Sequence, residues 1–193
     1  MTKFVPLADP VAVVAAEAAL RGGEAIVVPT DTVYGLAALP EHEDALFSLK
    51  GRPASVPIAV LVESLEQARR IVTLTPAAER VARAFWPGPL TLVLARIDGS
   101  ATLGVRCPDH SFVRALARRV GPLSVTSANR HGQPTPVTAT EVAAALDGHV
   151  GLVVDGGRCD GAASTVVDGC DETLTILRAG PISAEQVRAA ALR

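Results

Sequence analysis

Four cationic side chains lie at positions from which they could act on a ligand. Lys50 and Arg52 form a Lys-x-Arg pair, while Arg106 and Arg178 each end a short apolar run. Neutral hydrogen-bonding side chains occur in similar settings, at Thr30, Ser127, Asn129 and Ser164. Cations combined with hydroxyl groups suit a polyphosphate and a small polar ligand, because guanidinium and ammonium groups form charge-assisted hydrogen bonds to phosphate and carboxylate oxygens.

The usual nucleotide-binding motifs do not occur in the sequence. There is no GxxxxGK[ST] pattern, and Gly22-Gly23 is not followed by GxGxxG spacing. The four histidines lack the spacing of metal ligands, so no metal site is predicted. Lys50 is the only lysine besides Lys3, which makes it the only lysine inside the expected domain. An ATP site in this chain would therefore be of another type.

Each of these residues also has a purely structural interpretation. Thr30 can satisfy backbone groups of a turn, and Tyr34 can be a core residue. Lys50 and Arg52 can end a solvated helix. Ser127 and Asn129 can form a capping turn, and the two arginines can form surface ion pairs.

Length and charge set limits on the class of protein. The chain has 193 residues, a hydrophobic fraction of 49% and a net charge of -2. This length suits one domain over residues 1–193 with a sizeable core. No apolar run is long enough for a membrane helix, and three cysteines without a CxxC pair indicate reduced thiols, so a cytoplasmic protein without a membrane partner is expected.

The pattern of apolar residues predicts alternating helices and strands. Helices are expected over 8–21, 41–49, 64–70, 75–85, 109–120, 138–146 and 183–191. Strands are expected over 25–29, 58–62, 90–96, 103–106, 123–126, 150–155, 164–168 and 174–178. Several strands are continuous apolar runs, which predicts an α/β fold with a mostly covered sheet, and the glycine turns between the last strands predict that the sheet is mixed.

Seven short motifs in order resemble the YrdC-like family of threonylcarbamoyl-AMP synthases. They are 29–36 (PTDTVYGL), 50–52 (Lys-x-Arg), 86–91 (WPGPLT), 105–108 (VRCP), 126–129 (TSAN), 164–168 (STVVD) and 178–180 (RAG). The resemblance covers about residues 10–190 and is similar to the short, single-domain form of the family. It implies a twisted, mixed parallel and antiparallel sheet with flanking helices and a concave cavity lined by cations.

The resemblance also implies an activity. Family members combine L-threonine, bicarbonate and ATP into threonylcarbamoyl-AMP and pyrophosphate, which makes them nucleotidyltransferases. A downstream threonylcarbamoyl transferase complex passes the group to tRNA, and tRNA itself is a further candidate partner. Mg²⁺ is expected to travel with ATP, held mainly by the phosphates.

Site roles follow from matching positions. The resemblance implies that Lys50 and Arg52 are catalytic and bind the ATP phosphates. The residues expected to bind threonine or carbamate are Thr30, Tyr34, Arg106, Ser127 and Ser164. The further ATP-binding residues are expected to be Thr102, Asn129 and Arg178.

Two positions depart from the family pattern, and a second class of function remains open. Val56-Pro57 and Leu61 stand where some members have Asn-Pro and His, which leaves the threonine side-chain contact and the preference over serine open. The alternative is a double-stranded RNA or tRNA-binding module without catalysis. The slightly acidic net charge and 3% aromatic content count against that alternative.

Overall fold

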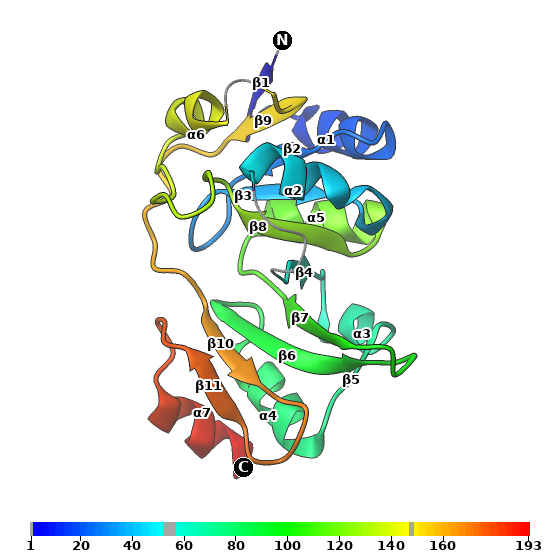
Figure 1. The fold of residues 1–193 in the computed structure, drawn as a ribbon, viewed down its shortest axis with the longest axis vertical. Helices are drawn as coiled ribbons and strands as arrows, with labels where there is room; N and C mark the ends of the chain where they lie inside the picture. The colour runs from blue at the N-terminus through cyan, green and yellow to red at the C-terminus, as the bar shows by residue number, and fades with distance from the viewer. Residues whose placement is uncertain (1, 52–56, 147–148) are drawn as a thin grey trace.

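A computed structural model describes residues 2–51, 57–146 and 149–193 (Figure 1). Arg52 and Val56 lie outside these ranges. Within the described ranges, the strands are β1 (Lys3–Pro6), β2 (Ile26–Val28), β3 (Gly35–Ala38), β4 (Ala59–Leu61), β5 (Val72–Thr73), β6 (Leu90–Arg96), β7 (Thr102–Arg106), β8 (Leu123–Ser127), β9 (Leu152–Asp155), β10 (Thr165–Asp168) and β11 (Thr175–Arg178).

Helices alternate with these strands along the chain. They are α1 (Ala12–Arg21), α2 (Asp44–Lys50), α3 (Leu65–Ala68), α4 (Pro76–Phe85), α5 (Ser111–Val120), α6 (Ala139–Ala145) and α7 (Ala184–Ala191), with a 3-10 turn, η1, at Pro40–His42. None of the described helices is both long and apolar enough to cross a membrane.

The strands form one mixed sheet, as the sequence predicted. Their order is β1-β9-β2-β3-β8-β4-β7-β6-β10-β11, and β5 pairs with β6 at the side. The pairs β1/β9, β2/β9, β4/β7 and β6/β10 are parallel, while the other pairs, including β10/β11, are antiparallel. The sheet twists along its length, so that β10 and β11 run steeply across the direction of β2 and β3 (Figure 1).

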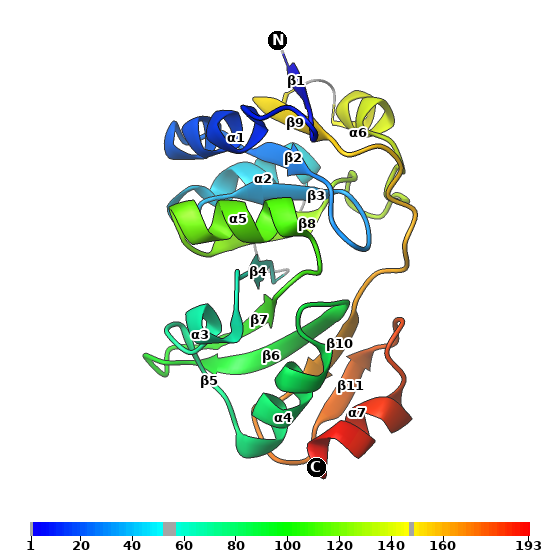
Figure 2. The ribbon, with the colours of Figure 1, turned by 180° about the vertical axis from the view of Figure 1, so that it is seen from behind.

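Helices cover both faces of the half of the sheet that contains β2 and β3. Ile26 and Val28 pack into a core with α1 and α5, while Val27 points to the opposite face and packs with α2 and α6. This alternation follows from the two-residue period of a strand. Figure 2 shows α1 and α5 side by side on one face of this half.

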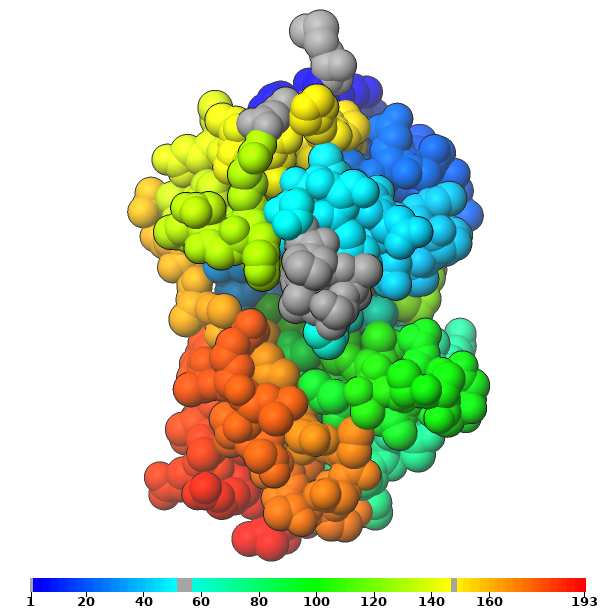
Figure 3. Space-filling model, in the orientation of Figure 1, coloured from blue at the N-terminus to red at the C-terminus, as the bar shows by residue number. Residues whose placement is uncertain are grey.

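In the other half, the core lies on one face of the sheet. Leu90, Leu92 and Leu94 of β6 pack in the core that contains residues of α3, α4 and α7. Thr91, which lies between them in the strand, points away from this core, and its hydroxyl contacts the Ser164 hydroxyl. The sheet surface opposite α4 and α7 is therefore available to build a site, and the molecule is hollowed where the two halves meet (Figure 3).

Cap chemistry sets several helix ends. Thr138 and Glu141 form the predicted capping box of α6, and Thr75 caps α4 by accepting a hydrogen bond from the Ala78 N–H. The first helix begins later than the predicted range of 8–21 indicates. The Asp9 carboxylate accepts a hydrogen bond from the Val11 N–H, which makes 9–11 a turn, and the helix begins at Ala12.

Leu92 tests the assignment of the core. Its side chain is fully buried, so Leu92→Ala should lower the free energy of unfolding by about 2–5 kcal/mol. Leu177→Ala is the matched control, because Leu177 is 55% exposed and its loss should change stability by less than about 0.5 kcal/mol. Denaturant titration followed by circular dichroism measures both; equal effects in the two variants would contradict the assignment.

Candidate functional site

The loop between β2 and β3 is held together by threonine hydroxyls. The Thr30 hydroxyl donates to the Val33 carbonyl at 2.6 Å and accepts from the N–H groups of Thr32 and Val33 at 3.1 and 3.2 Å. It also lies 3.0 Å from the Thr32 hydroxyl. Thr30 therefore satisfies backbone groups of a turn, and the same turn directs both threonines toward a cavity.

Arg106 lies at the end of β7 and is 6% exposed. Its guanidinium donates from Nη2 to Asp31 Oδ1 at 2.5 Å, from Nη1 to Thr32 Oγ1 at 2.9 Å and from Nε to the Gly88 carbonyl at 3.0 Å. This is a buried ion pair, so the interpretation of Arg106 as part of a surface ion pair was wrong. A guanidinium has five N–H donors, and these three contacts leave donors available for a ligand in the cavity.

Arg178 ends β11 and is held by Ser164 at the exposed mouth of the cavity. Its Nε and Nη2 donate to the Ser164 carbonyl at 3.1 and 2.8 Å, and Nη2 also donates to the Ser164 hydroxyl at 3.0 Å. Partial burial, and then the charge of Arg106, lower the pKa of Arg178. Because the two guanidinium groups repel each other, an anion bound between them would be favoured.

Lys50 ends α2 and is buried, which excludes its interpretation as a solvated helix end. Its ammonium group donates to the Ser127 carbonyl and, at 3.1 Å, to the Asn129 carboxamide oxygen. The Ser127 hydroxyl donates to the same oxygen, while the Asn129 amide group donates to the carbonyls of Arg130 and Gln133. Lys50 and Asn129 thus form a polar cluster directly behind Ser127.

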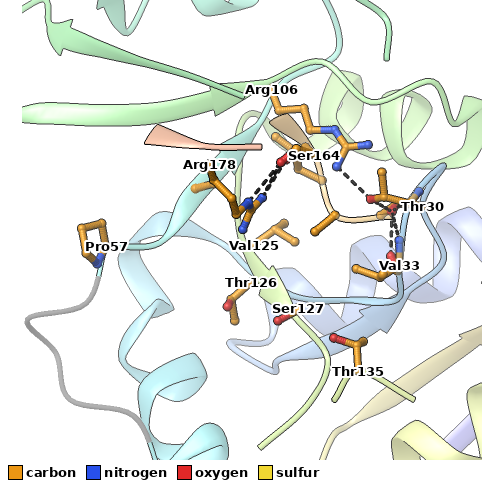
Figure 4. A pocket seen from close by; sticks show the side chains of 14 residues that line it. Thr30, Val33, Pro57, Arg106, Val125, Thr126, Ser127, Thr135, Ser164 and Arg178 are labelled. Atoms are coloured by element: carbon orange, nitrogen blue, oxygen red, sulfur yellow. Dashed lines mark hydrogen bonds between the residues drawn. The ribbon is translucent and has the colours of Figure 1, made fainter. Parts of the chain in front are cut away.

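These elements enclose a cavity of about 290 Å³, at the lower end of the range for small-molecule sites (Figure 4). The side chains on its walls come from both halves of the sheet. Its lining comprises Thr30, Thr32, Val33, Pro57, Ala59, Leu61, Arg106, Val125, Thr126, Ser127, Thr135, Ala163, Ser164 and Arg178.

Five of the residues expected from the sequence converge on this cavity: Thr30, Arg106, Ser127, Ser164 and Arg178. Thr102, expected to bind ATP, is not among the lining residues. The reason is geometric, because Thr102 begins β7 and Arg106 ends it, which separates them by about 13 Å along the strand. Arg52, also expected in the site, lies outside the described residues.

Tyr34 is placed behind the cavity and not among its lining residues. Its side chain is fully buried. The hydroxyl donates to the Gly157 carbonyl at 2.7 Å and accepts from the Gly156 N–H at 3.1 Å. Tyr34 therefore fixes the segment that follows β9, which connects the two halves of the molecule on one side (Figure 1).

Sequence reasoning did not select several residues that build the site. Thr32 supports Arg106, and Thr91 supports Ser164. The position of Thr32, two residues after Thr30 in a polar loop, was a usable signal. Thr91 was harder to find, because it lies among the apolar residues of β6. Its polar side chain is the sign in the sequence that it faces away from the core.

The fold and site define a class: an α/β protein that presents cations and hydroxyl groups to a small ligand at strand ends. Comparison with known proteins identifies the family. The Sua5/YciO/YrdC family model, described as "Telomere recombination", matches residues 18–180. This match covers most of the chain, which therefore belongs to the Sua5/YciO/YrdC family.

Related sequences and structures agree with this assignment. A Mycobacterium tuberculosis (strain H37Rv) protein is 38% identical over 204 residues, covering 97% of this chain and 94% of that protein. The threonylcarbamoyl-AMP synthase of Bacillus subtilis is 38% identical over 189 residues, covering 90% of this chain and 55% of its own length. The structure of Pyrococcus abyssi Sua5 complexed with L-threonine superposes with a TM-score of 0.90 at 32% identity, covering 98% of this chain and 60% of that one.

Tyr34→Phe tests whether this side chain is structural. The substitution removes a buried hydroxyl and leaves the Gly156 N–H without its acceptor, so the free energy of unfolding should fall by about 1–3 kcal/mol. Affinity for ligands of the cavity should stay unchanged in calorimetric titration. Loss of affinity with wild-type stability would instead place Tyr34 in the binding site.

Alkaline titration gives a second test, because Tyr34 is the only tyrosine of the chain. Burial raises the pKa of Tyr34 from 10.0 to about 12. A raised pKa in the folded state means that the stability it contributes is fully present below pH 10 and is lost as the pH rises through about 12. The ultraviolet absorbance of tyrosinate should therefore appear near pH 12, and appearance near pH 10 in folded protein would contradict the burial.

Proposed function

We propose that this protein is a threonylcarbamoyl-AMP synthase, an enzyme that forms threonylcarbamoyl-AMP and pyrophosphate from L-threonine, bicarbonate and ATP. The observation that carries the proposal is the convergence of Arg106 and Arg178 with the hydroxyls of Thr30, Ser127 and Ser164 on one small cavity. The names of the Bacillus subtilis and Pyrococcus abyssi relatives support the reaction. The L-threonine in the Pyrococcus abyssi Sua5 structure supports the amino acid.

In this proposal the two sides of the cavity bind different parts of the reactants. Arg106 receives the carboxylate or carbamate of the amino acid through its free N–H donors, and the Ser164 hydroxyl, with Thr30 at the wall of the cavity, contacts the remaining groups of threonine. Lys50, Asn129 and Arg178 serve the nucleotide, and Arg52 is proposed to join them at the phosphates. Tyr34 is proposed to stabilise the segment that follows β9 without contacting the reactants.

The chemistry requires little covalent participation by the protein. The threonine nitrogen forms a bond to the bicarbonate carbon, whose C–OH bond breaks, and the hydroxide leaves with an amine proton as water. One oxygen of the resulting carbamate then attacks the α-phosphorus of ATP. The bond from that phosphorus to the bridging oxygen breaks, and pyrophosphate leaves with the electron pair. Fixed cations stabilise the negative charge that develops on the leaving group, and holding three substrates in position lowers the entropic barrier.

Mg²⁺ is proposed to arrive with ATP, coordinated by phosphate oxygens. The described residues contain no group of three or more His, Cys, Asp or Glu side chains arranged to hold a metal ion. Arg106 and Arg178 at the cavity suit the phosphate oxygens and not a divalent cation. The product is proposed to serve threonylcarbamoyl transfer to tRNA in the cytoplasm by a separate transferase complex. No feature of the described structure favours the RNA-binding module over this enzyme.

Pyrophosphate release tests the proposal. Purified protein with ATP, bicarbonate and Mg²⁺ should release pyrophosphate only when L-threonine is present. Lys50→Ala should reduce the rate by about 100-fold or more, as expected when a fixed charge is removed from a phosphate site. Lys3→Ala is the matched control, because Lys3 is an exposed residue of β1 and its loss should leave the rate unchanged. No release from folded wild-type protein would refute the proposal.

A further inference from the structure

Asp31 is a largely buried acid that forms its ion pair with Arg106. Its side chain is 14% exposed, and Oδ1 lies 2.5 Å from Arg106 Nη2. The second oxygen, Oδ2, is buried and has no hydrogen-bond partner among the described residues. Burying a carboxylate is unfavourable unless it is paired, so the position of Asp31 is explained by its contact with this one guanidinium.

Asp31 is absent from the cavity lining, although Thr30 and Thr32 on either side of it belong to that lining. It therefore stands behind Arg106 as seen from the ligand. Thr32 Oγ1 and the Gly88 carbonyl hold the other two anchored nitrogens of the same guanidinium. Three fixed acceptors on different segments leave the Arg106 plane little freedom to rotate.

The neighbouring cation makes this anchoring necessary. Arg178 lines the same cavity, so two like charges share one space and repel each other. Without an anchor, Arg106 would be free to turn away from Arg178 and from the cavity. A group that holds it in place reduces the conformational entropy that a ligand must otherwise remove on binding.

We infer that Asp31 is a positioning residue, which holds the Arg106 guanidinium in the orientation that binds the carboxylate of the amino-acid substrate. The inference rests on the proposed function, because it takes L-threonine as the ligand of Arg106. It differs from the view that Asp31 only reduces the positive charge of the cavity. The two views predict opposite changes in the affinity for an anionic ligand when the Asp31 charge is removed.

Asp31→Asn separates these views. Removing the negative charge makes the cavity more positive, so a role in charge balance alone predicts tighter binding of anionic ligands. Positioning predicts the reverse: the Kd for N-acetyl-L-threonine, a net anionic analogue that keeps the carboxylate and lacks the ammonium group, rises at least about tenfold, as when a partner of a buried charged pair is lost. Isothermal titration with this analogue, alongside L-threonine, measures it. Equal or tighter binding by folded Asp31→Asn would overturn the inference.

Asp160→Asn is the charge-matched control. Asp160 lies on the segment that bridges to Val33, and its exposed carboxylate pairs with Arg158 at the surface. Its substitution removes the same charge without touching Arg106, and L-threonine affinity should not fall. A loss equal to that of Asp31→Asn would show that charge near the loop decides binding and would overturn the positioning role.

A double-mutant cycle tests whether Asp31 acts through Arg106. Asp31→Asn should have no further effect on L-threonine binding in an Arg106→Ala background, whereas additive losses would contradict the inference. In pyrophosphate release, Asp31→Asn should raise the KM for L-threonine, and saturating L-threonine should restore the rate. A lower kcat with unchanged KM would oppose positioning.

Thr32→Val repeats the test if Asp31→Asn does not fold, since it removes another anchor of the same guanidinium at similar volume. The Kd for L-threonine should rise again, and unchanged affinity would count against the anchoring. Wild-type protein that neither binds L-threonine nor releases pyrophosphate would refute the proposed function itself. Wild-type binding that Asp31→Asn leaves intact would refute only the positioning role.

Discussion

The central constraint on this structure is that like charges must be kept close together around a cavity. Arg106 and Arg178 face the same space. Partial burial, and then the charge of Arg106, lower the pKa of Arg178. The fold meets this constraint by binding each cation to groups that belong to the protein: Arg106 to Asp31, Arg178 to Ser164 and Lys50 to the end of β8. The cations are thus in place before an anion arrives, which is the condition for electrostatic preorganisation.

Most of these anchors are neutral oxygens, and this choice has a physical basis. A carboxylate beside every cation would neutralise the cavity and compete with an anionic ligand. Carbonyl and hydroxyl oxygens satisfy N–H donors while leaving the positive charge available. Of the two arginines at the cavity, Arg106 is the more deeply buried and has a carboxylate partner, whereas Arg178 is held by oxygens of Ser164. The burial of Arg106 explains the difference, since an unpaired guanidinium in the interior would be far more costly than one at the cavity mouth.

The sequence revealed those parts of the fold and site that depend on local patterns. The apolar run of Leu90–Arg96 and the Thr138 capping box were predicted because periodicity and caps act over a few residues. β3 (Gly35–Ala38) was not expected, because glycine and alanine have low strand propensity and only pairing with β2 and β8 makes this segment a strand. The contact between Asp31 and Arg106 joins residues 75 apart, and no local pattern encodes such a contact.

The order of the cavity residues along the chain has a consequence for folding during synthesis. The cavity walls begin at Thr30 and end at Arg178, so nearly the whole chain must leave the ribosome before the last wall can form. Even the half of the sheet around β2 and β3 must wait for β8 and β9, with which these two strands pair. Binding competence is therefore acquired only after Arg178 has been synthesised, and any ligand of the cavity selectively stabilises chains in which this wall has formed.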